Sequence, residues 1–273
     1  MKFDMSRAWD TATEMMSANR DVMLVVVGMF VFLPNLALAL WMGDTAETLQ
    51  AQAAANPEAA MDAVMDFYSG MAIPMVILSL IQGVGVLALL SLLSDARRPT
   101  VGEALKTGLT CLLPYFAVQI MQGFLMALIV IVPVATGAAI AVPLGILLGL
   151  VALAAVAYIW VKFSLSAPAL AIEGVRNPIA AMQRSWALTK GNSLSIFLFF
   201  VLLMLALVVV SVVVSAVGGL LFALASSEIA LIGNAVIGSA LNAIMAMVMI
   251  ASLASIHRQL SGGSPQAASE PFE

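Results

Sequence analysis

The chain has 273 residues, of which 63% are hydrophobic and 10% charged, and its net charge is −4. Soluble globular domains carry about 25% charged residues, so this composition excludes that class and indicates an integral membrane protein. No segment has a dense basic face, and we therefore expect no nucleic-acid partner.

Six apolar segments are long enough to cross a bilayer, because a helix needs about 20 residues to span a hydrocarbon core of roughly 30 Å. They cover about residues 23–42, 71–93, 109–132, 143–161, 195–224 and 229–255. We therefore predict an all-α fold, a polytopic bundle of six transmembrane helices that forms a single membrane domain over residues 1–260. The composition of residues 261–273, rich in Gly, Ser, Pro and Ala, is typical of a flexible cytoplasmic tail.

The first apolar segment is predicted to be retained rather than cleaved as a signal peptide. It contains a small-x-small pair at residues 37–39, which resembles a cleavage site. However, the residues before it include four acids, Asp4, Asp10, Glu14 and Asp21, whereas a signal peptide begins with a positive segment. The apolar run also has full membrane-spanning length, which favours an uncleaved helix.

An internal repeat organises the chain. Residues 97–108 and 176–191 both begin with Arg-x-Pro, and they end with Ala-Leu-Lys-Thr-Gly and Ala-Leu-Thr-Lys-Gly. Residues 7–9 (RAW) are similar to residues 184–186 (RSW). We predict three hairpins of two spans, over about 4–95, 99–167 and 177–258, each preceded by a short cytoplasmic amphipathic helix.

Capping signals mark the ends of the second and third short helices. Thr100 with Glu103 forms a capping box, Asn177 lies at the N-cap before a proline, and Gly108 and Gly191 are predicted to end the two helices.

All eleven Lys and Arg residues lie on one side of this six-span arrangement. They occur in the terminal segments and in those after the second and fourth spans, whereas five of the fifteen acids crowd the segment between the first two spans: Asp44, Glu47, Glu58, Asp62 and Asp66. Because basic residues stay on the cytoplasmic side, we predict that both termini are cytoplasmic.

The short helices are predicted to lie at the inner leaflet, with Trp at headgroup level and Arg or Lys near the lipid phosphates. Alternatively, these side chains only orient the hairpins, since such anchors are routine at span ends. The candidate contacts to lipid headgroups or partner proteins are Arg7, Trp9, Arg97, Arg98, Lys106, Arg176, Arg184, Trp186 and Lys190.

Neutral amides are the most polar groups predicted within the spans: Gln82, Gln119, Gln122, Asn234 and Asn242. Gln119 and Gln122 share a helix face, so they either line a polar path or bond across helices. Stripes of small residues at 137–149 and 211–227 recur every four residues. They allow close helix packing, either within the bundle or in a homo-oligomer.

The sequence predicts no catalytic, cofactor or metal site. His257 is the only histidine, and no carboxylate or cysteine is spaced to join it in a metal site, so we interpret it as a headgroup contact. Glu173 and Lys162, near the inner end of the fourth span, either pair or remain solvated. We expect a protein that is not an enzyme.

Three consecutive motifs carry a family resemblance: residues 167–173 (APALAIE), 177–181 (NPIAA) and 184–192 (RSWALTKGN). They resemble the segment between spans 4 and 5 of the bacterial glycerophosphoryl diester phosphodiesterase membrane-domain family. The resemblance implies a multi-pass module of a bacterial inner membrane, near lipid or glycerophosphodiester metabolism. The chain has no room for the catalytic barrel that accompanies this domain in some members, so no activity is implied.

Two functions fit these observations. The first is a non-enzymatic inner-membrane protein that organises membrane lipids or partner proteins through its cytoplasmic helices. The second is a small-molecule or lipid transporter, suggested by the amides and by the hairpin repeat, which transporters often share.

Overall fold

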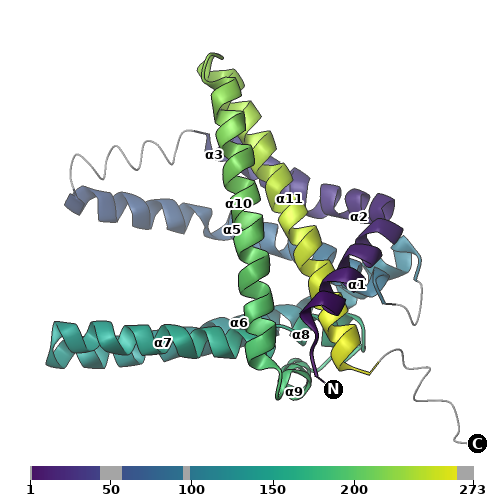
Figure 1. Ribbon diagram of the computed structural model, residues 1–273. Helices are drawn as coiled ribbons and strands as arrows, with labels where there is room; N and C mark the ends of the chain where they lie inside the picture. Colours follow the sequence, from purple (N-terminus) through teal and green to yellow (C-terminus); the bar gives the residue numbers. More distant parts are fainter. Residues whose placement is uncertain (1, 44–56, 95–98, 263–273) are drawn as a thin grey trace, which may run out of the picture. The chain divides into compact units, whose positions relative to one another are not determined.

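The computed structural model describes residues 2–43, 57–94 and 99–262 (Figure 1). Within these ranges all regular structure is helical, and six segments are long and apolar enough to cross a membrane. The predicted all-α, six-span fold is confirmed, and the protein is a multi-pass membrane protein. The spans are Arg20–Met42, Ser69–Leu92, Val101–Ile140, Val142–Ala171, Ser193–Phe222 and Ser227–Leu260.

The helices follow the predicted order. The first span combines α2 (Arg20–Val27), the π-helical turn η1 (Gly28–Phe32) and α3 (Leu33–Met42), and it follows the short helix α1 (Met5–Ala18). The next three spans are formed by α5 (Pro57–Leu92), α6 (Val101–Ile140), and α7 (Val142–Phe163) with α8 (Ser166–Ala171). The short helix α9 (Pro178–Thr189) precedes the last two spans, α10 (Ser193–Phe222) and α11 (Ser227–Leu260).

The predicted caps are present. The backbone N–H of Glu103 donates to Thr100 Oγ1 at 3.3 Å, and the Thr100 N–H donates to Glu103 Oε2 at 2.8 Å, which completes the capping box of α6. Asn177 Oδ1 accepts from two backbone N–H groups of α9, and the chain leaves that helix through Gly191, whose φ of +82° suits glycine.

One helix boundary was predicted wrongly. Gly108 does not end a short second helix, because it is buried inside α6, which continues without a break from Val101 to Ile140. A glycine in a helix interior costs only about 1 kcal/mol relative to alanine, and the long apolar sequence that follows outweighs that cost. The short helices that form separate elements are therefore α1 and α9, and the predicted second short helix is the first part of α6.

Small residues bring α6 and α7 together as a tight hairpin. A Cβ placed on Gly137 would lie 2.9 Å from the Cα of Gly145, and one on Gly145 would lie 2.9 Å from the backbone nitrogen of Ala138. Neither position has room for a side chain. The stripe at 137–149 thus serves packing within the chain, and Figure 1 shows the two helices side by side.

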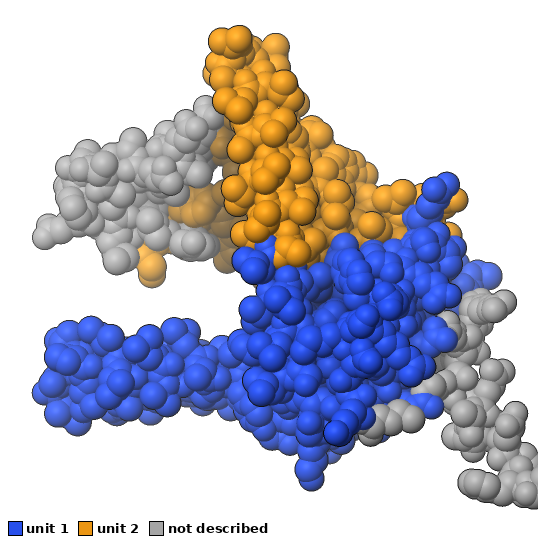
Figure 2. Space-filling view, in the orientation of Figure 1, with its two compact units in different colours: residues 1–20, 86–205, 248–273 blue, residues 21–85, 206–247 orange. Residues whose placement is uncertain are grey.

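The chain divides into two compact units (Figure 2). Unit 1 comprises residues 1–20, 86–205 and 248–273, and unit 2 comprises residues 21–85 and 206–247. In unit 2, Gly85 lies against Phe30, and Gly218 lies against Ile237. Ser215 and Gly219, from the second predicted stripe, are exposed. Unit 1 holds the short helices α1 and α9 and a core of fully buried side chains: Leu87, Leu89, Leu90, Leu165, Leu170, Ile196 and Ile256.

Candidate functional site

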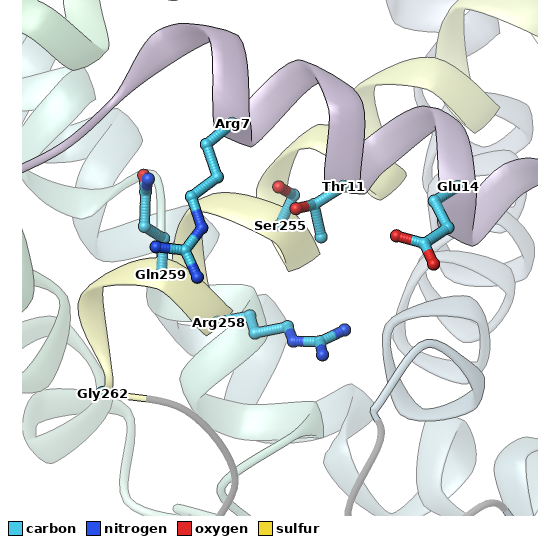
Figure 3. Close-up of a pocket in the computed structure, with 7 residues that line it drawn as sticks. All are labelled: Arg7, Thr11, Glu14, Ser255, Arg258, Gln259 and Gly262. Atoms are coloured by element: carbon cyan, nitrogen blue, oxygen red, sulfur yellow. The ribbon is translucent and has the colours of Figure 1, made fainter.

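A polar cavity of about 430 Å³ lies between α1 and the last turns of α11, within unit 1 (Figure 3). Residues at helical spacing form both walls, since side chains three or four positions apart share one helix face. The lining residues are Arg7, Thr11 and Glu14 from α1, Ser255, Arg258 and Gln259 from α11, and Gly262.

Hydrogen bonds fix the two walls to each other. The hydroxyl of Ser255, a buried residue of α11, donates to the backbone oxygen of Ala8 at 2.6 Å. The side-chain amide of Gln259 accepts from the backbone nitrogen of Asp4 and donates to its oxygen, both at 3.3 Å. Ser255 and Gln259 therefore hold α1 in place.

Charged side chains of both signs face the cavity. Arg7 and Arg258 extend into it from different helices, and Glu14 lies at the other end of the α1 wall, with Thr11 between Arg7 and Glu14 (Figure 3). Among the described residues, neither Arg7 nor Glu14 has a side-chain ion pair. Guanidinium groups bind phosphate and carboxylate oxygens in a bidentate manner, so the cavity is suited to an anionic group.

A second polar cavity, of about 340 Å³, brings two of the predicted contacts together. Lys106 from α6 and Arg176 from the segment before α9 both line it, with Ser91, Pro99, Glu103, Thr107 and Thr110. The two cations outnumber the single carboxylate of this cavity, Glu103, which accepts hydrogen bonds within the capping box. The predicted contacts Arg97 and Arg98 lie outside the described residues.

Glu173 joins α9 to α11 through a three-residue cluster. Its carboxylate accepts from Arg184 Nε at 2.8 Å and Nη2 at 2.9 Å, and its Oε1 lies 2.9 Å from Nε2 of His257. An ionised carboxylate only accepts hydrogen bonds, so Nε2 of His257 carries the proton. His257 is 3% exposed, and its interpretation as a headgroup contact was therefore wrong.

The environment of Glu173 keeps its carboxylate ionised. Burial raises its pKa, but hydrogen bonds from His257 and Arg184 and the charges of these groups outweigh burial and lower the pKa from 4.5 to about 2. The same interaction raises the pKa of Arg184. Arg184 is thus committed to an ion pair, although its side chain remains 42% exposed. In the described ranges, no three His, Cys, Asp or Glu side chains group as a metal site.

The sequence comparison gives the family. The family model described as "Domain of unknown function (DUF7847)" matches residues 6–260. The chain belongs to the DUF7847 family. This match spans both walls of the α1/α11 cavity, from Arg7 to Gln259. No curated protein and no solved structure matches the chain.

In this DUF7847 chain, Lys162 does not pair with Glu173. It is 3% exposed, and its Nζ lies 5.1 Å from the ring centroid of Trp186 and 5.4 Å from that of Tyr158, where cation–π attraction stabilises it. Ser185 fixes the same region, because its hydroxyl donates to the Lys162 oxygen at 2.7 Å and accepts from the Leu165 nitrogen at 3.0 Å.

The remaining predicted residues of the DUF7847 chain have separate environments. Trp186 is partly engaged by Lys162, whereas Trp9 and Lys190 are exposed. Gln122 bonds across helices, donating to the Phe163 oxygen at 3.2 Å, but Gln119 is exposed, so the two amides do not form a common path. Gln82 is half-buried, and Asn234 and Asn242 are exposed.

The sequence did not indicate Thr11, Glu14, Ser255, Arg258 and Gln259 as site residues. Thr11 and Glu14 follow Arg7 at helical spacing, and this was the one local signal for them. Ser255 and Gln259 act through contacts to residues about 250 positions away, which no local pattern reveals.

Proposed function

We propose that this DUF7847 protein is a non-enzymatic organising module of a bacterial inner membrane, which binds phospholipid headgroups at its cytoplasmic side. The observation that carries the proposal is the cavity between α1 and α11, with Arg7 and Arg258 on facing walls. A phospholipid phosphate is an anion of the size and chemistry that two guanidinium groups hold.

The position of the cavity along the chain supports a lipid ligand. All eleven basic residues lie on one side of the six spans, which by the positive-inside rule is the cytoplasmic side. α1 also bears the exposed Trp9, and tryptophan favours the headgroup layer. The resemblance of residues 167–192 to a membrane domain associated with glycerophosphodiester chemistry points to the same class of ligand.

The test measures retained lipid in the purified protein. Native mass spectrometry of the full chain, after exchange into mild detergent with defined phospholipid, gives the fraction of protein with bound lipid. We expect Arg7→Gln to weaken lipid binding about tenfold. This factor corresponds to about 1.4 kcal/mol, near the lower end of the free energy that a hydrogen bond to a charged group contributes. Lys2→Gln is the matched control, because it removes one basic charge from an exposed site that lines neither cavity and is not among the predicted headgroup contacts. Equal retention by wild type and Arg7→Gln would contradict the proposal.

A further inference from the structure

The α1/α11 cavity holds opposite charges that do not neutralise each other directly. Arg7 and Glu14 line it seven residues apart on one face of α1, and among the described residues neither has an ion-pair partner. Seven residues correspond to about 10 Å of helix rise, so the side chains are too far apart for the usual contact between neighbouring turns. A ligand that carries both charges would meet both side chains.

We infer that this cavity binds a phosphodiester that carries an ammonium group on a two-carbon arm. The inference rests on the proposed lipid binding and specifies the headgroup. The phosphate lies against Arg7, Arg258 and the Thr11 hydroxyl, and the ammonium donates to the Glu14 carboxylate. Two sources supply this chemistry, the headgroup of phosphatidylethanolamine and the soluble diester glycerophosphoethanolamine.

The dimensions of such a ligand fit the spacing on α1. Phosphorus and nitrogen lie about 5 Å apart across four bonds of ordinary length. A hydrogen-bonded contact of about 2.8 Å at each end extends this to about 10 Å, which matches the rise from Arg7 to Glu14. The walls are already joined by Ser255 and Gln259, so the two charged ends of the cavity are held in position before a ligand enters.

Glu14 also discriminates between headgroups. A phosphatidylglycerol headgroup has the phosphate but no cation, and its glycerol leaves the carboxylate without a partner of opposite charge. A charged group that one ligand pairs and another leaves unpaired is a common source of specificity. The cavity therefore prefers an ethanolamine headgroup to a glycerol headgroup.

The decisive experiment is a lipid competition on the full chain. Delipidated protein is reconstituted with equal amounts of phosphatidylethanolamine and phosphatidylglycerol, and native mass spectrometry gives the ratio of the two bound lipids. We expect wild type to enrich phosphatidylethanolamine, and Glu14→Gln to reduce the ratio about fivefold, the upper end for an exposed ion pair. Asp10→Asn is the matched control, because it removes one exposed acid from α1 that does not line the cavity.

The outcomes separate this inference from the proposed function. An unchanged lipid ratio in Glu14→Gln, together with loss of both lipids in Arg7→Gln, overturns the inference and leaves phospholipid binding in place. Lipid retention that is independent of Arg7 overturns both. Titration with glycerophosphoethanolamine identifies the source: displacement of bound lipid identifies the soluble diester as a ligand, and retention of lipid identifies the membrane headgroup.

Discussion

Replacing Glu173 with glutamine should destabilise the protein measurably, because one carboxylate joins α9 to α11. The substitution keeps the shape of the side chain but removes the charge that Arg184 and His257 both meet at 2.8–2.9 Å. Water cannot replace the lost interaction at His257, which is 3% exposed, but it can solvate Arg184, whose side chain is 42% exposed.

The pKa of Glu173 gives the magnitude. A fall in this pKa from 4.5 to about 2 corresponds to about 3 kcal/mol of folding stability at neutral pH, since each pKa unit is equivalent to about 1.36 kcal/mol. Solvent screening at Arg184, which is 42% exposed, reduces the expected loss to about 2 kcal/mol. For a chain of this size that loss lowers Tm by about 4–8 °C.

The pH dependence gives an independent check with a defined sign. Because the folded-state pKa is lowered, the stabilisation is complete above pH 4.5 and disappears as the pH falls from 4.5 to about 2. Thermal unfolding of detergent-solubilised wild type and Glu173→Gln, measured from pH 7 to pH 3, should therefore converge towards the acidic end. Asp10→Asn, at an exposed position, serves as the control. A difference that is absent at pH 7, or that stays constant with pH, would refute the reasoning.

Three further predictions follow, of which the first two are measured by SDS titration of the purified protein and the third by labelling of cells. Gly145→Leu should prevent the close approach of α6 and α7 and cost about 1–3 kcal/mol in unfolding free energy, whereas Gly123→Leu, at an open position, should not. Ser185→Ala should lower the free energy of unfolding by about 1–3 kcal/mol, because it leaves buried backbone groups of Lys162 and Leu165 without their partner. Thr110→Ala, on the exposed face of α6, should lower it by less. In a Cys111→Ser background, Leu224→Cys, at an exposed position, should react with an impermeant maleimide on intact cells, and Lys190→Cys only after permeabilisation. The reverse labelling would contradict cytoplasmic termini.

The sequence predicts the features that depend on neighbouring residues. Six apolar runs indicate six spans, and the caps at Thr100 and Asn177 are readable because each involves side-chain and backbone groups within three positions. The small-residue stripe at 137–149 likewise predicts a close helix contact. Gly108 shows the limit of such signals, because a glycine ends a helix only where the following residues do not continue it.

The contacts that build unit 1 are of another kind. Glu173 and His257 are 84 positions apart, and Ser255 and Ala8 are 247 apart. The sequence suggested Lys162 as a partner for Glu173 because the two are near each other along the chain. In the fold the lysine meets aromatic rings, and the carboxylate meets groups from α9 and α11. Such pairings depend on how helices meet in space, which local spacing does not specify.

The most direct test of the central claim is an experimental structure of the full chain in nanodiscs that contain phosphatidylethanolamine and phosphatidylglycerol. We predict a phospholipid headgroup in the α1/α11 cavity, with its phosphate at Arg7 and Arg258 and its ammonium at Glu14. A cavity that is closed by protein side chains, or that remains without headgroup density while lipids are resolved around the spans, would contradict the account.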